Sequence, residues 1–396
     1  MSLLLKSFKT EIQPSENQKI LINKTIGVCR FIKNFYISEN TKAHKNKESF
    51  ITSNDFQVWL NNEFIPNNPD FIWIKDVSTK SVKQALRDTN GAYIRFFKGI
   101  SDAPTFKKKK HNDVSMYFVR NEKNYVIECE RHRIKVPTLG WIKLKEKGYI
   151  PTSDTGLYII KGNISIEAGR YYISVTIKYP DPIYENTNNT NEGIGIDLGI
   201  KDLAIVSNGN TYKNINKSNR VRKLEKQLRR SQRKLSRKHK NAKKGKATNY
   251  KNIHKQVEKI QKLHQRLTNI RNDYMNKVIS EIVKTKPSYI TIEDLNIAGM
   301  LKNKHLSKVI KDQKLSEFRR RLTWKCYLEG IELRVVSRWY PSSKKCNCCG
   351  KIKKDLKLSD RVYTCECGYT NDRDFNASLN LRDSTEFTIE YYKQDE

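Results

Sequence analysis

Three acidic residues, each next to a regular segment, constrain the fold of this 396-residue chain most strongly. Asp197 ends the apolar run of GIGIDLG, and Glu293 lies at the end of the β-rich run YITIED. Asp374 starts part of NDRDFNASLN, whose apolar residues could seat a helix. In an α/β sheet, catalytic groups collect beyond the carboxyl ends of the strands, so acids far apart in sequence can meet there. The three segments therefore predict an α/β sheet with a carboxylate cluster at one edge.

Such a cluster needs cations, because neighbouring carboxylates repel each other. Two Mg²⁺ or Mn²⁺ ions about 3.5–4 Å apart would neutralise it and hold the attacking and leaving oxygens of a phosphodiester. Each acid alone has an ordinary interpretation, since an acid after a strand often only caps the next helix. The combination favours a metal-dependent nuclease site formed by Asp197, Glu293 and Asp374. Asp372 is the alternative third ligand, and Asp294 is expected to cap a helix.

The overall charge limits the kinds of partner that the chain can have. Lys and Arg exceed Asp and Glu by 35, and the isoelectric point is near 9.8. Such an excess favours a polyanion bound over a wide surface, with nucleic acid as the leading candidate. No apolar run approaches the roughly 18 residues of a membrane-spanning helix, and the apolar patch in MSLLLKSFKTE is too short for a signal peptide. We therefore expect no membrane partner and a cytoplasmic, nucleoid-associated protein.

The chain is long enough for two or three domains, and its N-terminal half combines helical and β-rich patterns. Ser15 and Gln18 form a capping-box pattern that predicts a helix start, and further helices are expected from about Ser53 and Ser78. Short alternating runs between Ser115 and Ile177 predict strands. We expect a small antiparallel β-barrel, or a sandwich, at residues 1–12 and 104–180, with a helical insertion at 13–103 and a linker at 181–192.

The C-terminal half combines the acidic segments with a long helical hairpin. Apolar residues at helical spacing between Lys217 and Val283 predict two helices that are joined near Asn241 to Asn249. The nuclease domain is expected at residues 193–341 and 371–384, with a cysteine-rich module at 342–370. The remaining tail, residues 385–396, carries no clear pattern and is expected to be disordered.

The hairpin includes a strongly basic arm. About half of the residues from Arg220 to Lys246 are Lys or Arg, and Glu225 is the only acid among them. This charge could lie on a solvated face, yet the charge of the whole chain favours a nucleic-acid backbone, whose binding should weaken steeply with salt. The candidate contacts are Arg229, Arg230, Arg233, Lys234, Arg237 and Lys238 of the arm, with Lys107 and Lys108 of a basic loop at 107–110.

Five of the eight cysteines crowd into one short segment. Four of them form two pairs, each followed by a glycine: Cys346 with Cys349, and Cys365 with Cys367. Two such pairs predict a structural Zn²⁺ site with four thiolate ligands. Because the second pair is C-x-C, Cys348 is an alternative ligand, but the turn at Gly368 favours Cys367. The module precedes Asp374, so zinc loss could displace this acid as well.

With these pieces in place, the chain resembles the TnpB (OrfB) proteins of bacterial and archaeal insertion sequences, relatives of type V CRISPR effector nucleases. The resemblance covers nearly the whole chain and rests on FKTEIQPSENQ, CRFIKNF, APTFKKKK, GIDLGIKDLA, ITIEDLNIAGM, WYPSSKKCNCCG and LKLSDRVYTCECGYTNDRDFNASLN. It implies an α+β multidomain protein whose RNase H-like (RuvC) nuclease domain is interrupted by the helical hairpin and a zinc ribbon. By motif, Asp197, Glu293 and Asp374 correspond to the family's first, second and third catalytic acids.

The resemblance also implies a function. It points to a guide-RNA-directed DNA endonuclease, with guide RNA and target double-stranded DNA as partners and base pairing as the main source of specificity. A monomer on each RNA is expected. Three alternatives remain. One is a nuclease-silent, RNA-guided DNA-binding regulator, against which the three intact acids argue, and another is a transposase that acts directly on its element's ends. The third is a plain structure-selective nuclease, which would leave the large basic N-terminal half with little purpose. A discrete RNA that co-purifies with the protein would distinguish guided cleavage from direct DNA recognition.

Overall fold

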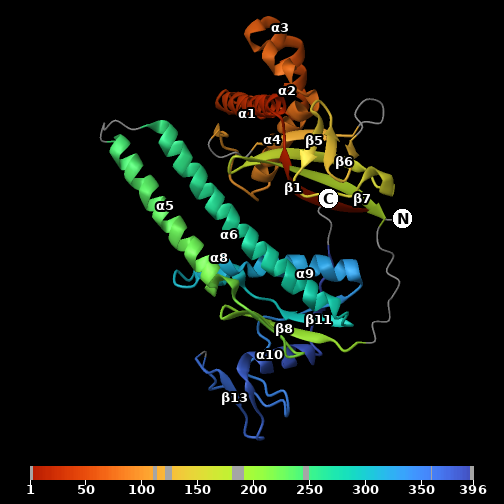
Figure 1. Ribbon diagram of the computed structural model, residues 1–396, viewed down its shortest axis with the longest axis vertical. Coiled ribbons are helices and arrows are strands. Elements are labelled where there is room, and N and C mark those ends of the chain that lie inside the picture. The colour runs from red at the N-terminus through yellow and green to blue at the C-terminus, as the bar shows by residue number, and fades with distance from the viewer. Residues whose placement is uncertain are drawn as a thin grey trace. The chain divides into compact units, whose positions relative to one another are not determined.

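The computed structural model describes residues 3–109, 114–120, 127–180, 191–243, 249–357 and 359–392, and the chain forms two compact units (Figure 1). Unit 1 spans Met1–Asp181 and unit 2 spans Pro182–Glu396. Most of the expected linker and the end of the basic loop lie outside the described residues. None of the described helices combines the length and the apolar character that a bilayer crossing requires.

The helices of unit 1 pack around aromatic side chains. The predicted capping box is confirmed at α1 (Glu16–Lys45), where Ser15 N donates to Gln18 Oε1 at 2.9 Å and Gln18 N donates to Ser15 Oγ at 3.4 Å. The helices predicted near Ser53 and Ser78 are confirmed as well. They are α2 (Ser53–Trp59) and α4 (Thr79–Phe97), which are connected through η1 (Leu60–Phe64), α3 (Ile65–Asn67) and η2 (Pro69–Asp76). Tyr36 and Phe56 are fully buried in their shared core.

The β-rich part of unit 1 is an open sheet, so the expected barrel is wrong. Its order is β2-β6-β7-β1-β5-β4-β3, and among the described residues the edge strands β2 and β3 do not pair with each other. The long strand β1 pairs with β7 from Leu3 to Ile12 and turns to β5 only at its end. Alternating residues predict strands, but they do not specify the pairing of first and last strands that closes a barrel. The strands are β1 (Leu3–Gln13), β2 (Met116–Val119), β3 (Glu128–Cys129), β4 (Arg133–Val136), β5 (Gly140–Leu144), β6 (Ile159–Glu167) and β7 (Arg170–Pro180).

Unit 2 is built on a mixed sheet of six strands in the order β10-β9-β8-β11-β12-β15. The three central strands β8, β11 and β12 run parallel to one another, and the outer strands pair antiparallel. Apolar side chains of α6 and α9 share a buried core with this sheet. The strands are β8 (Ile194–Leu198), β9 (Asp202–Val206), β10 (Thr211–Lys213), β11 (Tyr289–Glu293), β12 (Glu332–Val336) and β15 (Thr388–Ile389).

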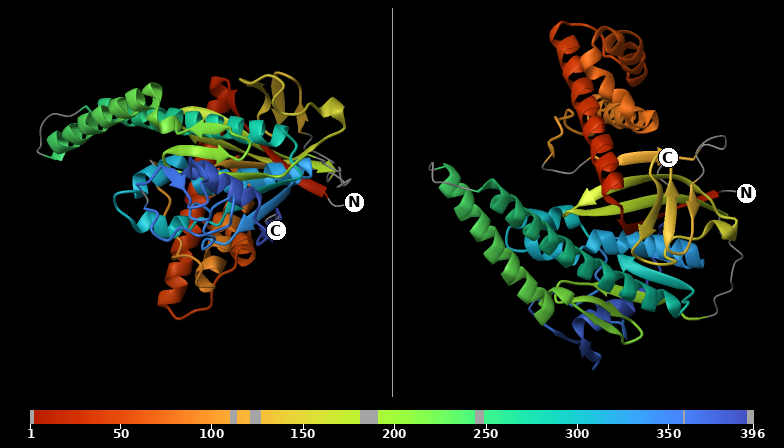
Figure 2. Two further views of the ribbon diagram at one scale, coloured as in Figure 1. Left: turned by 90° about the horizontal axis from the view of Figure 1, so that it is seen from below. Right: turned by 45° about the horizontal axis from the view of Figure 1, so that its top comes forward.

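The predicted helical hairpin of unit 2 is confirmed. After the short η5 (Ile215–Lys217), α5 (Asn219–Lys243) and α6 (Tyr250–Lys284) lie side by side in every view (Figure 2). Leu224 and Leu228 of α5 pack against Leu263 and Leu267 of α6. Helix α5 extends to Lys243, into the turn predicted at Asn241 to Asn249, whereas α6 begins directly after it; residues 244–248 lie outside the described residues.

The remaining elements of unit 2 surround the sheet and the cysteine-rich module. They are α7 (Ile297–Lys302), α8 (Ser307–Gln313), α9 (Leu315–Glu329), β13 (Val362–Thr364), β14 (Thr370–Asp372) and α10 (Arg373–Arg382). The expectation of a disordered tail is wrong for the described part of it. There β15 pairs with β12, Arg319 Nε donates to Glu390 Oε2 at 2.7 Å, and the rings of Trp324 and Tyr392 lie 4.6 Å apart.

Candidate functional site

Asp197 and Glu293 lie at the carboxyl ends of neighbouring parallel strands. The register of β8 and β11 places Ile194 opposite Ile290 and Gly195 opposite Thr291. The same register, continued by two residues, places Asp197 beside Glu293. Neighbouring strands are about 4.8 Å apart, and paired residues point to the same face. The sheet itself therefore brings these two carboxylates together.

Asp374 reaches the same place because α10 packs directly on β8. Gly195 and Asp197 share one face of β8, since alternate residues of a strand point the same way. A Cβ atom on Gly195 would lie 2.0 Å from the carbonyl oxygen of Ser378 and 2.4 Å from the backbone nitrogen of Arg382, both on α10. Glycine at this position is what lets the helix backbone approach the strand. Asp374 lies in the first turn of this helix.

Asp372, the alternative third acid, is the N-cap of α10. Its Oδ1 accepts hydrogen bonds from the backbone nitrogens of Asp374 at 3.0 Å and Phe375 at 3.1 Å. An N-cap of this kind satisfies backbone donors that would otherwise lack a partner. The side chain of Asp372 thus has a structural task that the side chain of Asp374 does not share.

Asp294 does not cap the following helix, so that expectation is wrong. Asn296 caps α7 and accepts from the backbone nitrogen of Gly299 at 2.9 Å. The two oxygens of Asp294 instead accept hydrogen bonds from Arg319 Nη1 and Arg338 Nη2, both at 2.7 Å. These bonds lower the pKa of Asp294, so it stays ionised. Three residues, 294–296, separate the end of β11 from α7, and the last of them, Asn296, is the cap.

Burial and mutual repulsion oppose ionisation of the clustered acids. Burial raises the pKa of Asp197 well above its ordinary value, and the nearby carboxylates of Glu293 and Asp374 raise it further. Burial also raises the pKa of Glu293, although a hydrogen bond from Ser342 Oγ favours its ionised form. Negative charge is thus held here at a cost that a cation would remove. The donor set, carboxylate oxygens on convergent strand ends, fits Mg²⁺ or Mn²⁺.

The three acids line one cavity of about 310 Å³. Arg373 and Arg361 line it too, and both lie near Asp374: Arg373 Nη2 donates to Asp374 Oδ1 at 2.7 Å, and Arg361 Nη1 lies 3.7 Å from Asp374 Oδ2. The sequence analysis did not single out Ser342, Arg361 or Arg373. The two arginines could have been noticed, because they stand in the segments LSDR and NDRD that flank the second cysteine pair.

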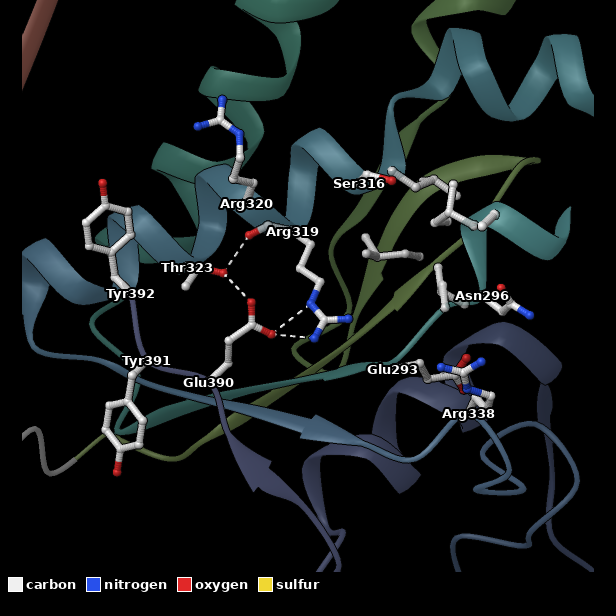
Figure 3. A pocket seen from close by; sticks show the side chains of 15 residues that line it. Glu293, Asn296, Ser316, Arg319, Arg320, Thr323, Arg338, Glu390, Tyr391 and Tyr392 are labelled. Carbon is white, nitrogen blue, oxygen red and sulfur yellow. Dashed lines mark hydrogen bonds and ion pairs between the residues drawn. The ribbon is translucent and has the colours of Figure 1, made fainter. Parts of the chain in front are cut away.

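A second cavity, of about 550 Å³, also includes Glu293 in its lining (Figure 3). The described tail lies along this cavity: Glu390 accepts from Arg319, and from Thr323 Oγ1 at 3.1 Å. Arg338 lines the same cavity and holds Asp294. The walls of this cavity are therefore held by ion pairs: Arg319 of α9 pairs with Glu390 of the tail and with Asp294 after β11, and Arg338 after β12 also pairs with Asp294.

The structure brings four cysteines together. The sulfur atoms of Cys346, Cys349, Cys365 and Cys367 all lie within 4.8 Å of one another. The exposed Cys348 is not part of this group. Gly350 and Gly368 follow the two pairs with φ values of 75° and 85°, a left-handed conformation that glycine adopts without strain. Four thiols at these distances fit one tetrahedral Zn²⁺ ion.

Buried asparagines of α10 connect the cysteine module to the acids. Asn376 Nδ2 and Asn380 Nδ2 both donate to the carbonyl oxygen of Lys345, at 2.8 Å and 2.7 Å. Asn380 also donates to the carbonyl oxygen of Ser342 at 2.7 Å. The first cysteine turn and the loop that carries Ser342 are thus held against the helix that carries Asp374.

The basic arm presents its charges on the surface of α5. Leu224 and Leu228 face the hairpin core, and Glu225, the only acid of the arm, lies 3.1 Å from Arg271 on α6. Of the predicted contacts, Arg229, Arg230, Arg233, Lys234 and Arg237 are exposed and Lys238 is half-buried. In unit 1, Lys108 is exposed, while Lys107 is half-buried and its backbone is bonded to Asn34.

Comparison with solved structures defines the class of fold. The chain is similar to the protein in "Cryo-EM structure of the Cas12f1-sgRNA-target DNA complex", with a TM-score of 0.53 and 14% sequence identity over 98% of this chain and 100% of that chain. At this identity the likeness concerns the fold alone, which is a mixed α/β fold of the Cas12f type.

Sequence comparison gives the family. Residues 172–304 match the family described as "Probable transposase" (OrfB_IS605), residues 316–381 match "Cas12f1-like, TNB domain", and residues 1–49 match "Helix-turn-helix domain". "Putative RNA-guided DNA endonuclease InsQ" of Escherichia coli (strain K12) is 30% identical over 95% of this chain and 91% of its own length. A "Putative RNA-guided DNA endonuclease" of Streptomyces pristinaespiralis is 29% identical over 96% and 89%. The chain belongs to the TnpB (OrfB) family.

Proposed function

We propose that this chain is an RNA-guided DNA endonuclease of the transposon-encoded TnpB type, which cuts DNA by hydrolysis of a phosphodiester bond. One observation carries the proposal: Asp197, Glu293 and Asp374 line a single cavity in a chain of this family. The names of the two relatives support the activity, and the intact acids favour cutting over a nuclease-silent regulator.

In this proposal Asp197, Glu293 and Asp374 hold two Mg²⁺ or Mn²⁺ ions. When bound, these ions neutralise the phosphodiester and supply an activated water. The chain's own residues position the acids: Ser342 donates to Glu293, and Arg373 donates to Asp374. Because the acids are held before substrate arrives, little free energy is spent on ordering them during the reaction.

We propose Zn²⁺ as the ion of the cysteine cluster, with Cys346, Cys349, Cys365 and Cys367 as its four thiolate ligands. The role is structural, since four thiolates leave no open position for substrate. The ion would keep the first cysteine turn in the shape to which Asn376 and Asn380 bind.

The proposed partners are a guide RNA and target double-stranded DNA, with one chain on each RNA and a place at the nucleoid. The exposed arginines and lysines of α5 would bind the RNA backbone, and Lys107 and Lys108 would add contacts from unit 1. The arm has no free carboxylate among its described residues to oppose this, because Glu225 is paired with Arg271. Base pairing would carry most of the sequence specificity.

The test is to sequence the RNA bound to protein purified from cells that carry its native flanking DNA, and to programme a Mg²⁺ cleavage assay with that RNA. We expect one abundant RNA with a variable 3′ segment and cutting of matching DNA. D197A should lower cutting by about 10³-fold or more and keep the RNA, because it removes only a metal ligand. The triple variant R229E/R230E/R233E should lose the RNA, whereas R229K/R230K/R233K, which keeps the charge, should retain it.

Each other outcome has a distinct meaning. Bound RNA without cutting would indicate a nuclease-silent regulator, and absence of bound RNA would indicate either direct recognition of element ends or an unguided nuclease. Unchanged cutting by D197A would refute the proposed acid site. RNA retention by the charge-reversed triple variant would refute the role of the arm alone.

A further inference from the structure

Trp339 is the most exposed large apolar side chain among the described residues, with 86% of its surface accessible. The other four tryptophans each contact a ring or a cation: Trp59 contacts Phe64, Trp73 contacts Phe31, Trp141 contacts Arg133 and Trp324 contacts Tyr392. In the described part of the chain, no ring or cation contacts Trp339. Tryptophan is highly buried on average, so this isolated exposed ring is a candidate for contact with a partner, which its position in the fold must support.

Both ends of the loop that carries Trp339 contact Glu293. Val336, the last residue of β12, lies opposite Glu293 in the sheet. Ser342, at the other end of the loop, donates a hydrogen bond to the Glu293 carboxylate. Trp339 lies midway, and three residues of chain reach at most about 11 Å from Val336. The exposed ring is therefore tied closely to one of the three proposed metal-binding acids.

The loop is held in place although the ring is not. Arg338 donates to Asp294 at 2.7 Å, and Tyr340 Oη donates to the carbonyl oxygen of Asn380 at 3.0 Å. The backbone nitrogen of Tyr340 donates to the carbonyl oxygen of Ser337 at 2.9 Å. These bonds fix the residues on both sides of Trp339. A ligand that stacks on the ring would thus meet a platform that is already oriented, which reduces the entropy lost on binding.

The surroundings of the ring favour a nucleic acid over a protein. Arg338, which pairs with Asp294, is exposed next to Trp339 in the chain, Lys344 is exposed shortly after the loop, and Arg361 lines the acid cavity. A protein-docking surface would need further exposed apolar residues around the tryptophan. An exposed aromatic ring in a basic stretch of the chain instead matches single-stranded nucleic acid, whose bases stack on aromatic side chains while its phosphates are drawn to Lys and Arg.

We propose that Trp339 stacks on a base of the DNA strand that is being cut, within a few nucleotides of the phosphate at the acid cavity. This inference rests on the proposed function and adds a positioning residue to it. Stacking holds the strand in register with Asp197, Glu293 and Asp374, and it does so for any sequence because every base offers a flat face. Trp339 itself touches no reacting atom.

The test compares W339A, W339L and W339F. All three should unfold at the wild-type temperature, because 86% of the surface of Trp339 is exposed. Stacking is monitored with 2-aminopurine placed at successive positions of single-stranded DNA, bound to the RNA-loaded protein in the D197A background, in which the strand stays intact. The wild-type and W339F rings should quench the fluorescence at one position, and W339A and W339L should not.

Cutting provides the second measurement, in otherwise wild-type protein. Loss of one stacked base should lower the cutting rate at limiting DNA by about 5- to 150-fold in W339A and W339L, with recovery in W339F. Activity of W339L equal to that of W339F would overturn the proposal, because apolar bulk would then suffice. Wild-type cutting and quenching by W339A would overturn it as well. If the wild-type protein fails to cut matched DNA, the proposed function fails, and position-specific quenching alone decides on the stacking.

Discussion

The carboxylate cluster and the cysteine cluster of unit 2 are both candidate metal sites, but they are assembled in opposite ways. The cysteines lie within 22 residues and are positioned by two glycine turns. The acids come from β8, β11 and α10, and their meeting depends on strand register and on the contact of α10 with Gly195. One site is therefore local to a short segment, whereas the other exists only when the whole sheet has formed.

The two sites are nevertheless connected through α10. The helix that carries Asp374 also carries Asn376 and Asn380, which bind the backbone of the first cysteine turn. The cysteine cluster thus helps to position the helix that carries Asp374. We therefore expect that disruption of the cysteine cluster also displaces Asp374. Substitution of an acid, by contrast, should leave the cysteine cluster intact.

The largest effect is expected from removal of zinc. Structural Zn²⁺ contributes roughly 10–16 kcal/mol of apparent folding free energy in small zinc domains. C349S should therefore lose bound zinc and cutting together, as measured by elemental analysis and the cleavage assay. C348S is the matched control and should keep both, because Cys348 is exposed outside the cluster. Equal damage by the two variants would break the assignment of ligands.

A smaller effect is expected where α10 meets β8. G195A places a methyl group 2.0 Å from a backbone carbonyl oxygen, so the helix must shift. Overpacking of this kind costs about 1–3 kcal/mol, and we expect a lower unfolding temperature together with reduced cutting. G27A is the control, since the nearest atom to a Cβ at Gly27 of α1 is 3.9 Å away. Normal cutting by G195A would show that Asp374 does not depend on this contact.

The smallest effect concerns the ionisation of Asp197. Its pKa is raised in the folded protein. The metal-free protein should therefore lose stability as the pH rises from the ordinary pKa of a carboxyl group to the raised pKa of Asp197. D197N removes this charge, so metal-free D197N should unfold at a higher temperature than the wild type at neutral pH, and the difference should shrink towards pH 4. Scanning calorimetry across this pH range provides the measurement.

Mg²⁺ should reverse the order of the two proteins. At a hundredfold excess over its Kd, a ligand stabilises the folded state by about 2.7 kcal/mol, or roughly 5–10 °C for a unit of this size. This gain should appear for the wild type and be reduced in D197N. Equal stabilisation of both proteins by Mg²⁺ would show that the ion binds elsewhere.

Much of the candidate site could be predicted from sequence because its signals are local. Each acid ends a strand or begins a helix, and each cysteine pair precedes a glycine, so the patterns are visible in short segments. The convergence of Asp197 and Glu293 followed from the general rule on parallel strand ends. Ser342 could not be found in this way, because its bond to Glu293 depends on the path of a loop between two elements.

The wrong expectations, of a closed barrel and of a disordered tail, also arose from contacts between residues far apart in sequence. Residues at strand spacing predicted strands in unit 1 but not which edges remain open. The order of the tail was not predicted because β15 has only two residues and its partners are far away in sequence. Arg319 precedes Glu390 by 71 residues, and Val335 of β12 precedes Thr388 by 53. Contacts of this kind leave no periodic pattern in either partner.

The position of α10 has a consequence for synthesis of the protein in the cell. Asp374 follows Asp197 by 177 residues, so a ribosome that adds about 5–20 residues per second needs about 10–35 s to pass from the first acid to the third. During that interval β8, the hairpin and β11 can leave the ribosome, but the helix that covers Gly195 does not yet exist. If the arm binds RNA as proposed, a nascent chain can therefore present it to RNA before it has a complete set of acids. Loading would then precede nuclease competence as a matter of chain order alone.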